Sequence, residues 1–231
     1  MSKLEPKPNS PLLRAKTTSD QLYSLLRVRI LDLQLAPGAV IYRRELSEEY
    51  GVSPMPLREA IARLSAEGLI DIHPQSKTMV SKIDMDDVRR MHFMRMSVEM
   101  EVARVLADSF APMVEAEEIL RQQEVALSRN DIMEFSKLDR IFHRSFHAEA
   151  GYEELWDLVI SHSGHIDRAR KLNLPASGAG RAAKFLKDHQ DMIRAVQNGS
   201  KDEASNAVRE HLQRFTVFAE QARVKNPEFF K

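Results

Sequence analysis

The residues best suited to chemistry lie in the stretch LDRIFHRSFH, residues 138–147. Asp139, His143 and His147 follow one another at intervals of four, which places them on one slowly drifting stripe of a helix. A carboxylate and an imidazole one turn apart can hold a divalent metal such as zinc, nickel, iron or manganese. The same spacing also suits an ordinary ion pair on a solvated helix. The stretch alone leaves both interpretations open.

The composition narrows the chemistry that the chain can support. Its 231 residues contain no cysteine, which excludes disulfides, thiolate metal sites and cysteine nucleophiles and is compatible with a reducing compartment. No apolar run has the length of a signal peptide or a membrane span, so we expect a cytoplasmic protein with no membrane partner. The 34 basic residues balance the 34 acidic ones. Any DNA binding must therefore come from a few well-placed arginines.

Hydrophobic periodicity predicts a small module followed by a larger, purely helical one. For the first module we predict a helix from Ser19 to the turn at Pro37-Gly38, helices at 44–50 and 54–67, and a hairpin of strands 69–73 and 78–83. For the second we predict helices at about 84–109, 112–129, 131–150, 152–172, 180–198 and 200–224. The predicted fold class is mainly α. It has a flexible arm over residues 1–18, an α+β module over 19–83 and an antiparallel helical bundle over 84–231.

Two predicted helices joined by a tight turn are typical of a helix-turn-helix, and the hairpin behind them would be its wing. Gly51 fits the turn, and Ser53 fits the cap of the second helix. Arg58 is left on the outer face, where a recognition helix touches base edges and an arginine adds about 1–3 kcal/mol of discrimination at guanine. Arg44 suits a phosphate or groove contact. The alternative is a helix pair without DNA function, with Arg58 on a solvated face.

The segment PGAVIYRRELSEEYGVSPMPLREAIARLSAEGLIDIHPQSKTMVS resembles the winged helix-turn-helix of GntR-type bacterial transcription regulators. The matching pieces are the PG turn, REL, GVS, PLREA, RL-x-x-EGL and T-x-V. The residues that we expect to contact DNA are Arg44, Ser53, Met55, Arg58, Lys77 and Thr78. Two positions depart from the family: Pro54 stands where a DNA-contacting arginine is usual, and Lys77 where the wing tip usually has glycine. The first changes the expected operator, and Lys77 could compensate through a phosphate contact.

Two further histidines, His189 and His211, extend the set formed by Asp139 and His143. His143, His189 and His211 lie on different predicted helices, and in a bundle such side chains can converge in the core. Three imidazoles and a carboxylate suit a divalent metal without any cysteine. For each histidine taken singly, a surface position or a hydrogen-bonded core position is the alternative. Spacing alone does not decide between these.

The helical module resembles the FadR C-terminal (FCD) ligand-binding domain. LDRIFH is similar to that domain's D-x-x-F-H, and DHQDMIRAVQNGSKDEASNAVREHL is similar to its ending. The resemblance implies that Asp139, His143, His189 and His211 hold a divalent metal, with zinc first and nickel, manganese or iron as alternatives. A small organic or sugar acid would occupy its open positions. His147 lies outside this set, and we expect a supporting or surface role for it; we place His162 and His165 at the surface or the pocket rim.

Three further residues are predicted to contact the effector. Arg95 falls in an R-x-x-x-E pattern that resembles the first FCD helix, where the arginine pairs with the effector's carboxylate in some members. A salt bridge from Arg95 to Glu99, one turn away, is the equal alternative. Arg168 or Arg170 would be a second contact for an anion. Tyr152 stands where the family commonly has asparagine, so a differently shaped pocket is expected.

These features predict a ligand-responsive regulator, not an enzyme, that acts as a homodimeric repressor or activator. Two recognition helices would read a pseudo-palindromic operator with half-sites roughly 34 Å apart. The effector would favour one of two dimer geometries. Two alternatives remain. A site of three histidines and one aspartate could activate water in a metal-dependent hydrolase, or the helical domain could serve dimerisation alone.

Overall fold

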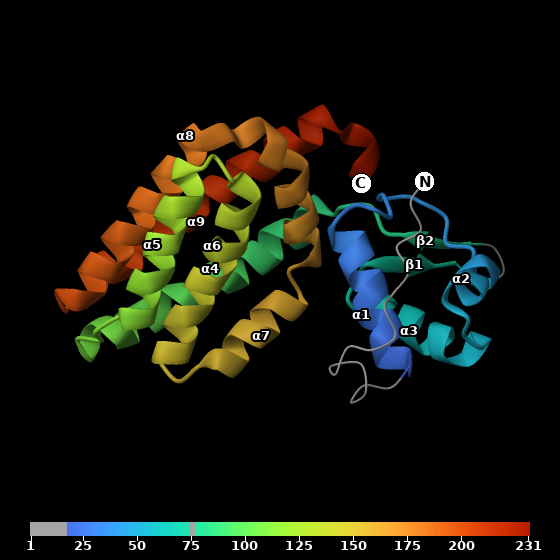
Figure 1. Ribbon diagram of the computed structural model, residues 1–231, viewed down its shortest axis with the longest axis horizontal. Helices are drawn as coiled ribbons and strands as arrows, with labels where there is room; N and C mark the ends of the chain where they lie inside the picture. Colours follow the sequence, from blue (N-terminus) through green and yellow to red (C-terminus); the bar gives the residue numbers. More distant parts are fainter. Residues whose placement is uncertain (1–17, 74–76) are drawn as a thin grey trace. The chain divides into compact units, whose positions relative to one another are not determined.

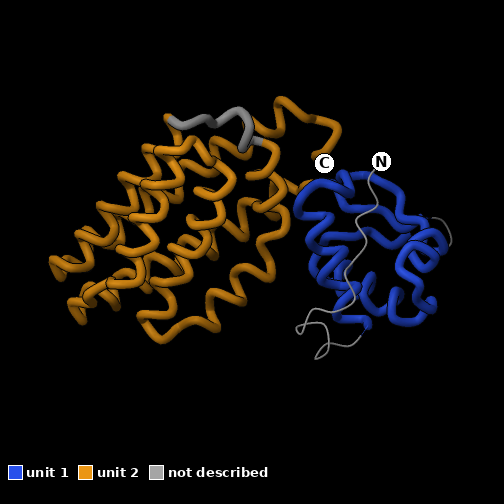
Figure 2. Tube along the Cα trace, viewed as in Figure 1, with its two compact units in different colours: residues 1–82 blue, residues 83–231 orange. Residues whose placement is uncertain are grey.

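The computed structural model describes residues 18–73 and 77–231, without the side chains of 173–179. It divides into two compact units, an N-terminal unit that ends at Lys82 and a helical unit from Ile83 to Lys231 (Figure 2). The N-terminal unit contains α1 (Thr18–Leu31), α2 (Arg43–Tyr50), α3 (Pro54–Ala66), β1 (Ile70–Ile72) and β2 (Thr78–Val80) (Figure 1). The arm predicted over residues 1–18 lies outside the described residues except for Thr18.

A regular apolar stripe holds the N-terminal unit together. Leu22, Leu26 and Ile30 are buried at intervals of four on α1, and α1 packs against α3. Gly51 joins α2 to α3 with a φ of 62°, a left-handed conformation that costs glycine little. Ser53 is the N-cap residue of α3, but its side chain makes no capping hydrogen bond. Pro54 follows at the first helical position, where its lack of an N–H costs nothing.

The wing is an antiparallel pair in which Ile70 faces Val80 and Ile72 faces Thr78. Its predicted turn, Pro74 to Lys77, lies outside the described residues apart from Lys77. The PG turn and the residues after it add backbone hydrogen bonds to β2: Gly38 donates to Val80 O at 2.9 Å and Ile41 to Thr78 O at 2.7 Å. The wing is therefore tied to the chain that leads into α2.

The helical unit contains α4 (Met85–Asp108), α5 (Val114–Ser128), α6 (Ile132–Glu149), α7 (Glu153–Ser161), α8 (Gly164–Gln197), α9 (Lys201–Lys225) and a final 3₁₀ turn, η2 (Pro227–Phe229). Helix α9 packs against α4 and α8, and α5 packs against α6. The helix predicted over 152–172 is wrong, because the chain breaks at His162-Ser163 between α7 and α8. The break predicted at 173–180, ahead of a separate helix at 180–198, is also wrong, because α8 runs as one helix from Gly164 to Gln197.

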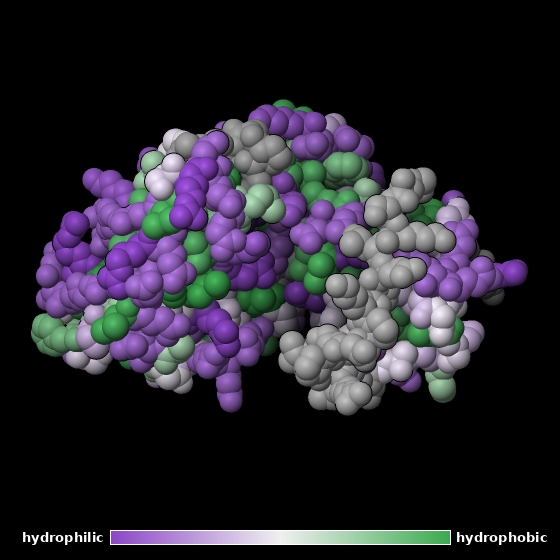
Figure 3. Space-filling model, in the orientation of Figure 1, coloured by the Kyte–Doolittle hydropathy of each residue, from purple (hydrophilic) through white to green (hydrophobic). Residues whose placement is uncertain are grey.

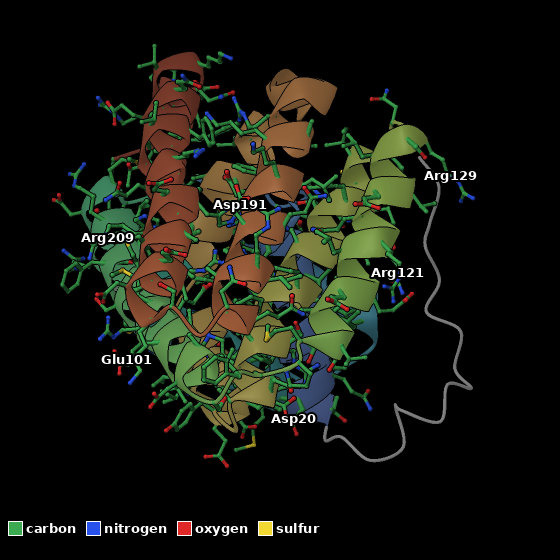
Figure 4. All side chains as sticks on the ribbon, turned by 90° about the vertical axis from the view of Figure 1, so that its left-hand side faces the viewer. Asp20, Glu101, Arg121, Arg129, Asp191 and Arg209 are labelled. Carbon is green, nitrogen blue, oxygen red and sulfur yellow. The ribbon has the colours of Figure 1, made fainter. Side chains whose placement is uncertain are left out.

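Charged side chains cover the outside of this bundle. Glu101, Arg121 and Arg209 point away from their helices (Figure 4), and hydrophilic residues dominate the face in Figure 3. The interior is apolar around Phe142 and Val196, both fully buried. Within the described helices, none is long and apolar enough to cross a membrane. The apolar packing of this interior does not explain why polar residues are also buried inside the bundle.

The start of the helical unit is fixed by the C-terminal residues and by α8. Ile83 donates its N–H to Phe229 O at 2.8 Å, and Lys231 donates its N–H to Ile83 O at 3.1 Å. The N–H of Asp84 donates to Nδ1 of His165 at 3.0 Å. The residues that lead into α4 are thus held by two distant parts of the chain.

The buried His165 makes stability depend on pH. Burial, and then the charge of Arg168, lower the pKa of His165 well below its ordinary value. The unfolded chain therefore binds more protons, so the free energy of unfolding should fall by about 1–3 kcal/mol as the pH drops below about 6.5. Urea unfolding of wild type and His165→Asn at about pH 5 and about pH 7 measures this, because asparagine can accept the same hydrogen bond without titrating. The same pH dependence in both proteins would contradict the assignment.

Candidate metal centre and nucleic-acid interface

Four buried side chains converge inside the helical unit. Asp139 and His143 come from α6, His189 from α8 and His211 from α9, and one possible ligand atom of each lies within 4.8 Å of the others. Nε2 of His143 is 3.2 Å from Nε2 of His211, and Nε2 of His189 is 3.5 Å from Oδ1 of Asp139. The four positions that the resemblance implied are thus brought together, although they span 73 residues of sequence between Asp139 and His211.

A second layer of acceptors fixes the far side of each histidine ring. Nδ1 of His143 lies 2.6 Å from Oε2 of Glu99, and Nδ1 of His189 lies 2.8 Å from Oε1 of Gln123. Nδ1 of His211 lies 3.3 Å from Oδ2 of Asp188. With Nδ1 donating outward, each Nε2 presents a lone pair to the centre, as in the histidines of metal sites. Sequence reasoning missed Gln123 and Asp188, and it considered Glu99 only as a partner of Arg95.

The protonation states match a site for a cation. Burial lowers the pKa of His143 and lowers that of His189 well below the ordinary value, so both rings are neutral at pH 7. Burial raises the pKa of Asp139, but Arg170 and the nearby histidines lower it more, and the net shift is downward. The cluster therefore offers one carboxylate and the uncharged imidazole nitrogens of His143 and His189, beside the ring of His211, a set suited to divalent zinc, nickel, iron or manganese.

One buried nitrogen atom of His189 tests whether a metal ion fits the four-residue cluster. Nε2 of His189 is buried and has no hydrogen-bond partner within residues 18–73 and 77–231 as described, whereas buried polar atoms are nearly always paired. It faces the Asp139 carboxylate together with the Nε2 atoms of His143 and His211, within the same 4.8 Å. A cation among these atoms would satisfy them all, so the residues present fit the group.

Arg95 forms a salt bridge with a neighbour on its own helix. It is buried, and its Nε donates to Oε1 of the equally buried Glu99, whose other oxygen meets His143. Burial raises the pKa of Glu99, but Arg95 and His143 lower it more, so this carboxylate is ionised. The salt bridge that sequence reasoning left open is therefore present, and it orients a member of the four-residue cluster.

The other predicted effector residues lie in different environments. Arg168 is fully buried, and its Nε donates to Gly164 O at 3.2 Å. Arg170 lies beside the cluster instead, with Nη1 3.3 Å from Oδ2 of Asp139. Tyr152 is 43% exposed just before α7. The structure thus brings Arg170, rather than Arg168, into contact with the four converging residues.

Two of the expectations for histidines are wrong in part. His147 is fully buried and His165 is 5% exposed, so neither has the surface position that was one option for each. His147 lies on the buried stripe of α6, and Nδ1 of His165 accepts a hydrogen bond from the N–H of Asp84. His162 is exposed, which agrees with the surface position that was one of the two predicted for it.

The N-terminal unit carries an exposed set of polar residues at the junction of α2 and α3. A depression of about 450 Å³ is lined there by Arg43, Arg44, Ser47, Glu48, Val52, Pro54, Leu57 and Arg58. Arg58 is exposed near the N-terminal half of α3, and Ser53 and Met55 are exposed beside it. Arg44 is exposed and lies 2.9 Å from Glu48 on its own helix. Lys77 is exposed immediately before β2.

Thr78 differs from the other predicted contacts. It is only 6% exposed, and its hydroxyl accepts hydrogen bonds from Nε and Nη2 of Arg43 at 3.1 and 2.7 Å. Its hydroxyl therefore faces Arg43 rather than solvent, and the pair ties the wing to the start of α2. Sequence reasoning missed Arg43, although the two adjacent arginines of YRREL were a signal that both could take part.

Comparison with known proteins decides the family. Residues 18–80 match the family described as bacterial regulatory proteins, gntR family, and residues 90–214 match the FCD domain. The chain belongs to the GntR family, with an FCD domain. It is a DNA-binding transcription regulator of that family, and the fold class and the GntR–FCD resemblance predicted from the sequence are confirmed.

Relatives and solved structures agree with this assignment. The chain is 34% identical over 217 residues to an HTH-type transcriptional regulator in an unstable DNA locus of Streptomyces ambofaciens, covering 93% of this chain and 90% of the relative. It is 31% identical over 214 residues to the HTH-type transcriptional repressor RspR of Escherichia coli K12, covering 92% and 93%. The fold is similar to that of E. coli McbR/YncC, with a TM-score of 0.73 at 17% identity over 89% of this chain and 98% of that one.

Proposed function

We propose that this GntR regulator senses a small carboxylate at a divalent metal held by Asp139, His143, His189 and His211. The observation that carries the proposal is the inward arrangement of three Nε2 atoms and one carboxylate, each imidazole fixed from behind by an acceptor. A divalent ion bound there would supply open coordination positions for the oxygens of an organic or sugar acid. We place no catalytic step at this site.

DNA recognition would come from the N-terminal unit. Arg58 on α3 is the proposed base-reading residue, because it is exposed on the helix that follows the turn. Arg44, Ser53, Met55 and Lys77 would position the unit on phosphates and groove edges. A homodimer would bring two such units to a pseudo-palindromic operator.

The coupling between effector and DNA would run through α4 and α8. Asp139 contacts Arg170 on α8, and the first turn of the same helix carries His165, which holds Asp84 at the start of α4. A ligand that shifts α8 would therefore act on the segment that follows the N-terminal unit. The shift changes DNA affinity only if the ligand binds one arrangement more tightly than the other.

The experiment is calorimetry with the metal-loaded and the chelator-stripped protein, using a panel of small mono- and dicarboxylates. We expect at least one acid to bind the metal-loaded protein and to lose most of its affinity after stripping. Equal binding to both forms would refute a role for the metal in sensing. No binding of any acid to a metal-loaded protein would favour a helical domain that serves dimerisation alone, and turnover of an ester or amide would favour the hydrolase.

Glu99→Gln tests the support behind the proposed metal. Gln is nearly the same size as Glu but has no charge, so it weakens the acceptor for Nδ1 of His143 and leaves Arg95 buried without its ionic partner. We expect metal affinity to fall about 10–100-fold, measured by competition with a fluorescent chelator. Glu101→Gln, on the outward face of α4 (Figure 4), is the matched control. Unchanged affinity in Glu99→Gln would show that this second layer does not tune the site.

A further inference from the structure

Most arginines of the N-terminal unit are paired with a carboxylate, and two are not. Of the six arginines between residues 18 and 82, four form ion pairs with acidic side chains: Arg27 with Glu67, Arg29 with Glu49, Arg44 with Glu48 and Arg63 with Asp20. Arg43 and Arg58 are exposed and form no ion pair within residues 18–73 and 77–231. Both line the depression at the junction of α2 and α3. The guanidinium charges that no carboxylate neutralises therefore lie together.

Arg43 is anchored to a neutral group. Its Nε and Nη2 atoms donate to Oγ1 of the buried Thr78 at 3.1 and 2.7 Å. A hydroxyl carries no charge, so the guanidinium is held in position while its positive charge stays uncompensated. A guanidinium has five N–H groups, so the two on Nη1 and one on Nη2 remain for a further acceptor. An arginine that is fixed in this way loses little conformational entropy when it binds an anion.

The place of Arg43 in the fold indicates which anion it would meet. Arg43 is the first residue of α2, which is the first helix of the helix-turn-helix. In this motif the first helix crosses the sugar–phosphate backbone, while the second enters the major groove. Pro54, which opens α3 on the same depression, offers neither a charge nor an N–H. Arg43 therefore supplies a cation on the side of the depression that the DNA backbone would pass.

We propose that Arg43 binds a phosphate of the DNA backbone and that Thr78 positions it for this contact. A guanidinium fork matches the oxygens of a phosphate, and such a contact adds affinity without reading the base sequence. Arg58 would read a base from α3, while Arg43 would hold the backbone beside it from α2. This inference rests on the proposed DNA recognition by the N-terminal unit and is independent of the metal centre.

Salt dependence tests the phosphate contact, because each neutralised phosphate adds about 1 to the slope of log affinity against log salt concentration. In the intact protein, Arg43→Ala is expected to weaken binding to a selected operator and to a random duplex alike, by about tenfold at about 50 mM salt. The slope, measured by fluorescence anisotropy up to about 200 mM salt, should fall by about 1 for each chain bound. Arg63→Ala removes the same charge from a carboxylate-paired site and should leave the slope near that of the wild type.

Three results would overturn the phosphate contact. They are an unchanged slope in Arg43→Ala, an equal change in Arg63→Ala, and a loss of affinity confined to the operator, since a phosphate contact lowers both affinities and leaves their ratio unchanged. Reduced discrimination is instead the result expected of Arg58→Ala, so failure of the base-reading role and failure of this inference are distinguishable.

Arg43→Lys keeps the charge but not the planar fork. It should retain the wild-type slope and lose less affinity than Arg43→Ala, because a lysine can still neutralise a phosphate. Arg43 is exposed, so thermal unfolding should stay near that of the wild type in both variants. A slope reduced in Arg43→Lys as far as in Arg43→Ala would contradict a role that depends on the charge.

Thr78→Val tests the positioning role. Valine has nearly the shape of threonine but no hydroxyl, so Arg43 keeps its charge and loses its anchor. Affinity for both DNAs is expected to fall about threefold to fivefold while the salt slope stays unchanged. In an Arg43→Ala background the same substitution should have no further effect, because Thr78 acts through Arg43. An equal loss in both backgrounds would show that Thr78 acts on the wing itself and would overturn its positioning role.

Discussion

His189→Ala is expected to reduce the bound metal from about one ion per chain to nearly none, an affinity loss of more than about 100-fold. The substitution removes the Nε2 atom that lies 3.5 Å from Oδ1 of Asp139. It also leaves Gln123 without its partner. His143→Ala should behave in the same way. The measurement is elemental analysis after reconstitution with zinc and removal of the excess.

The matched control for this prediction is His162→Ala. His162 is an exposed histidine of the same unit, whose Nδ1 lies near Ser161 and Leu158 O. This variant should keep its metal, since its ring lies outside the cluster. Metal retained in both His143→Ala and His189→Ala, or a wild type that takes up none, would remove the basis of the proposed sensor site.

Arg58→Ala is expected to lower discrimination between operator and random DNA about tenfold to a hundredfold, the effect of losing a bidentate contact to a guanine. Binding to random DNA at low salt should survive, because it depends on the summed phosphate contacts. Fluorescence anisotropy with an operator selected from random sequences, at two salt concentrations, separates the two effects.

Arg63→Ala is the control for Arg58 on the same helix. It makes the same change of charge, but the Arg63 guanidinium is held by Asp20 at 2.6 Å and lies over the Tyr23 ring. It should leave discrimination intact. If Arg58→Ala discriminates as well as the wild type does, the base contact belongs to another residue of the N-terminal unit.

Local patterns explain why the N-terminal unit was predictable. Gly51 sits in a left-handed turn that the residue type favours, and the intervals of four between Leu22, Leu26 and Ile30 become the buried face of α1. Leu25 and Val28, which share the apolar character but not the stripe, are 42% and 54% exposed. Thr78 was misplaced because its burial depends on Arg43, which lies 35 residues earlier in the chain.

The candidate metal centre was predictable only in part. Asp139 and His143 carry a local signal in their spacing, but His189 and His211 were assigned through the family resemblance. Gln123 gave no signal, since its contact with His189 joins helices 66 residues apart in sequence. The burial of His147 was missed because helical spacing shows which residues share a face but not how deeply the neighbouring α7 covers it.

The central claim is that a carboxylate acting at the metal centre changes DNA binding. The most direct test is the operator affinity of the zinc-loaded protein with and without the acid that calorimetry identifies, in the wild type and in His189→Ala. We predict that the acid shifts wild-type affinity at least about fivefold, in either direction, and leaves the variant's affinity unchanged. Equal operator affinity with and without the acid in the wild type, or the same shift in His189→Ala, would contradict the claim.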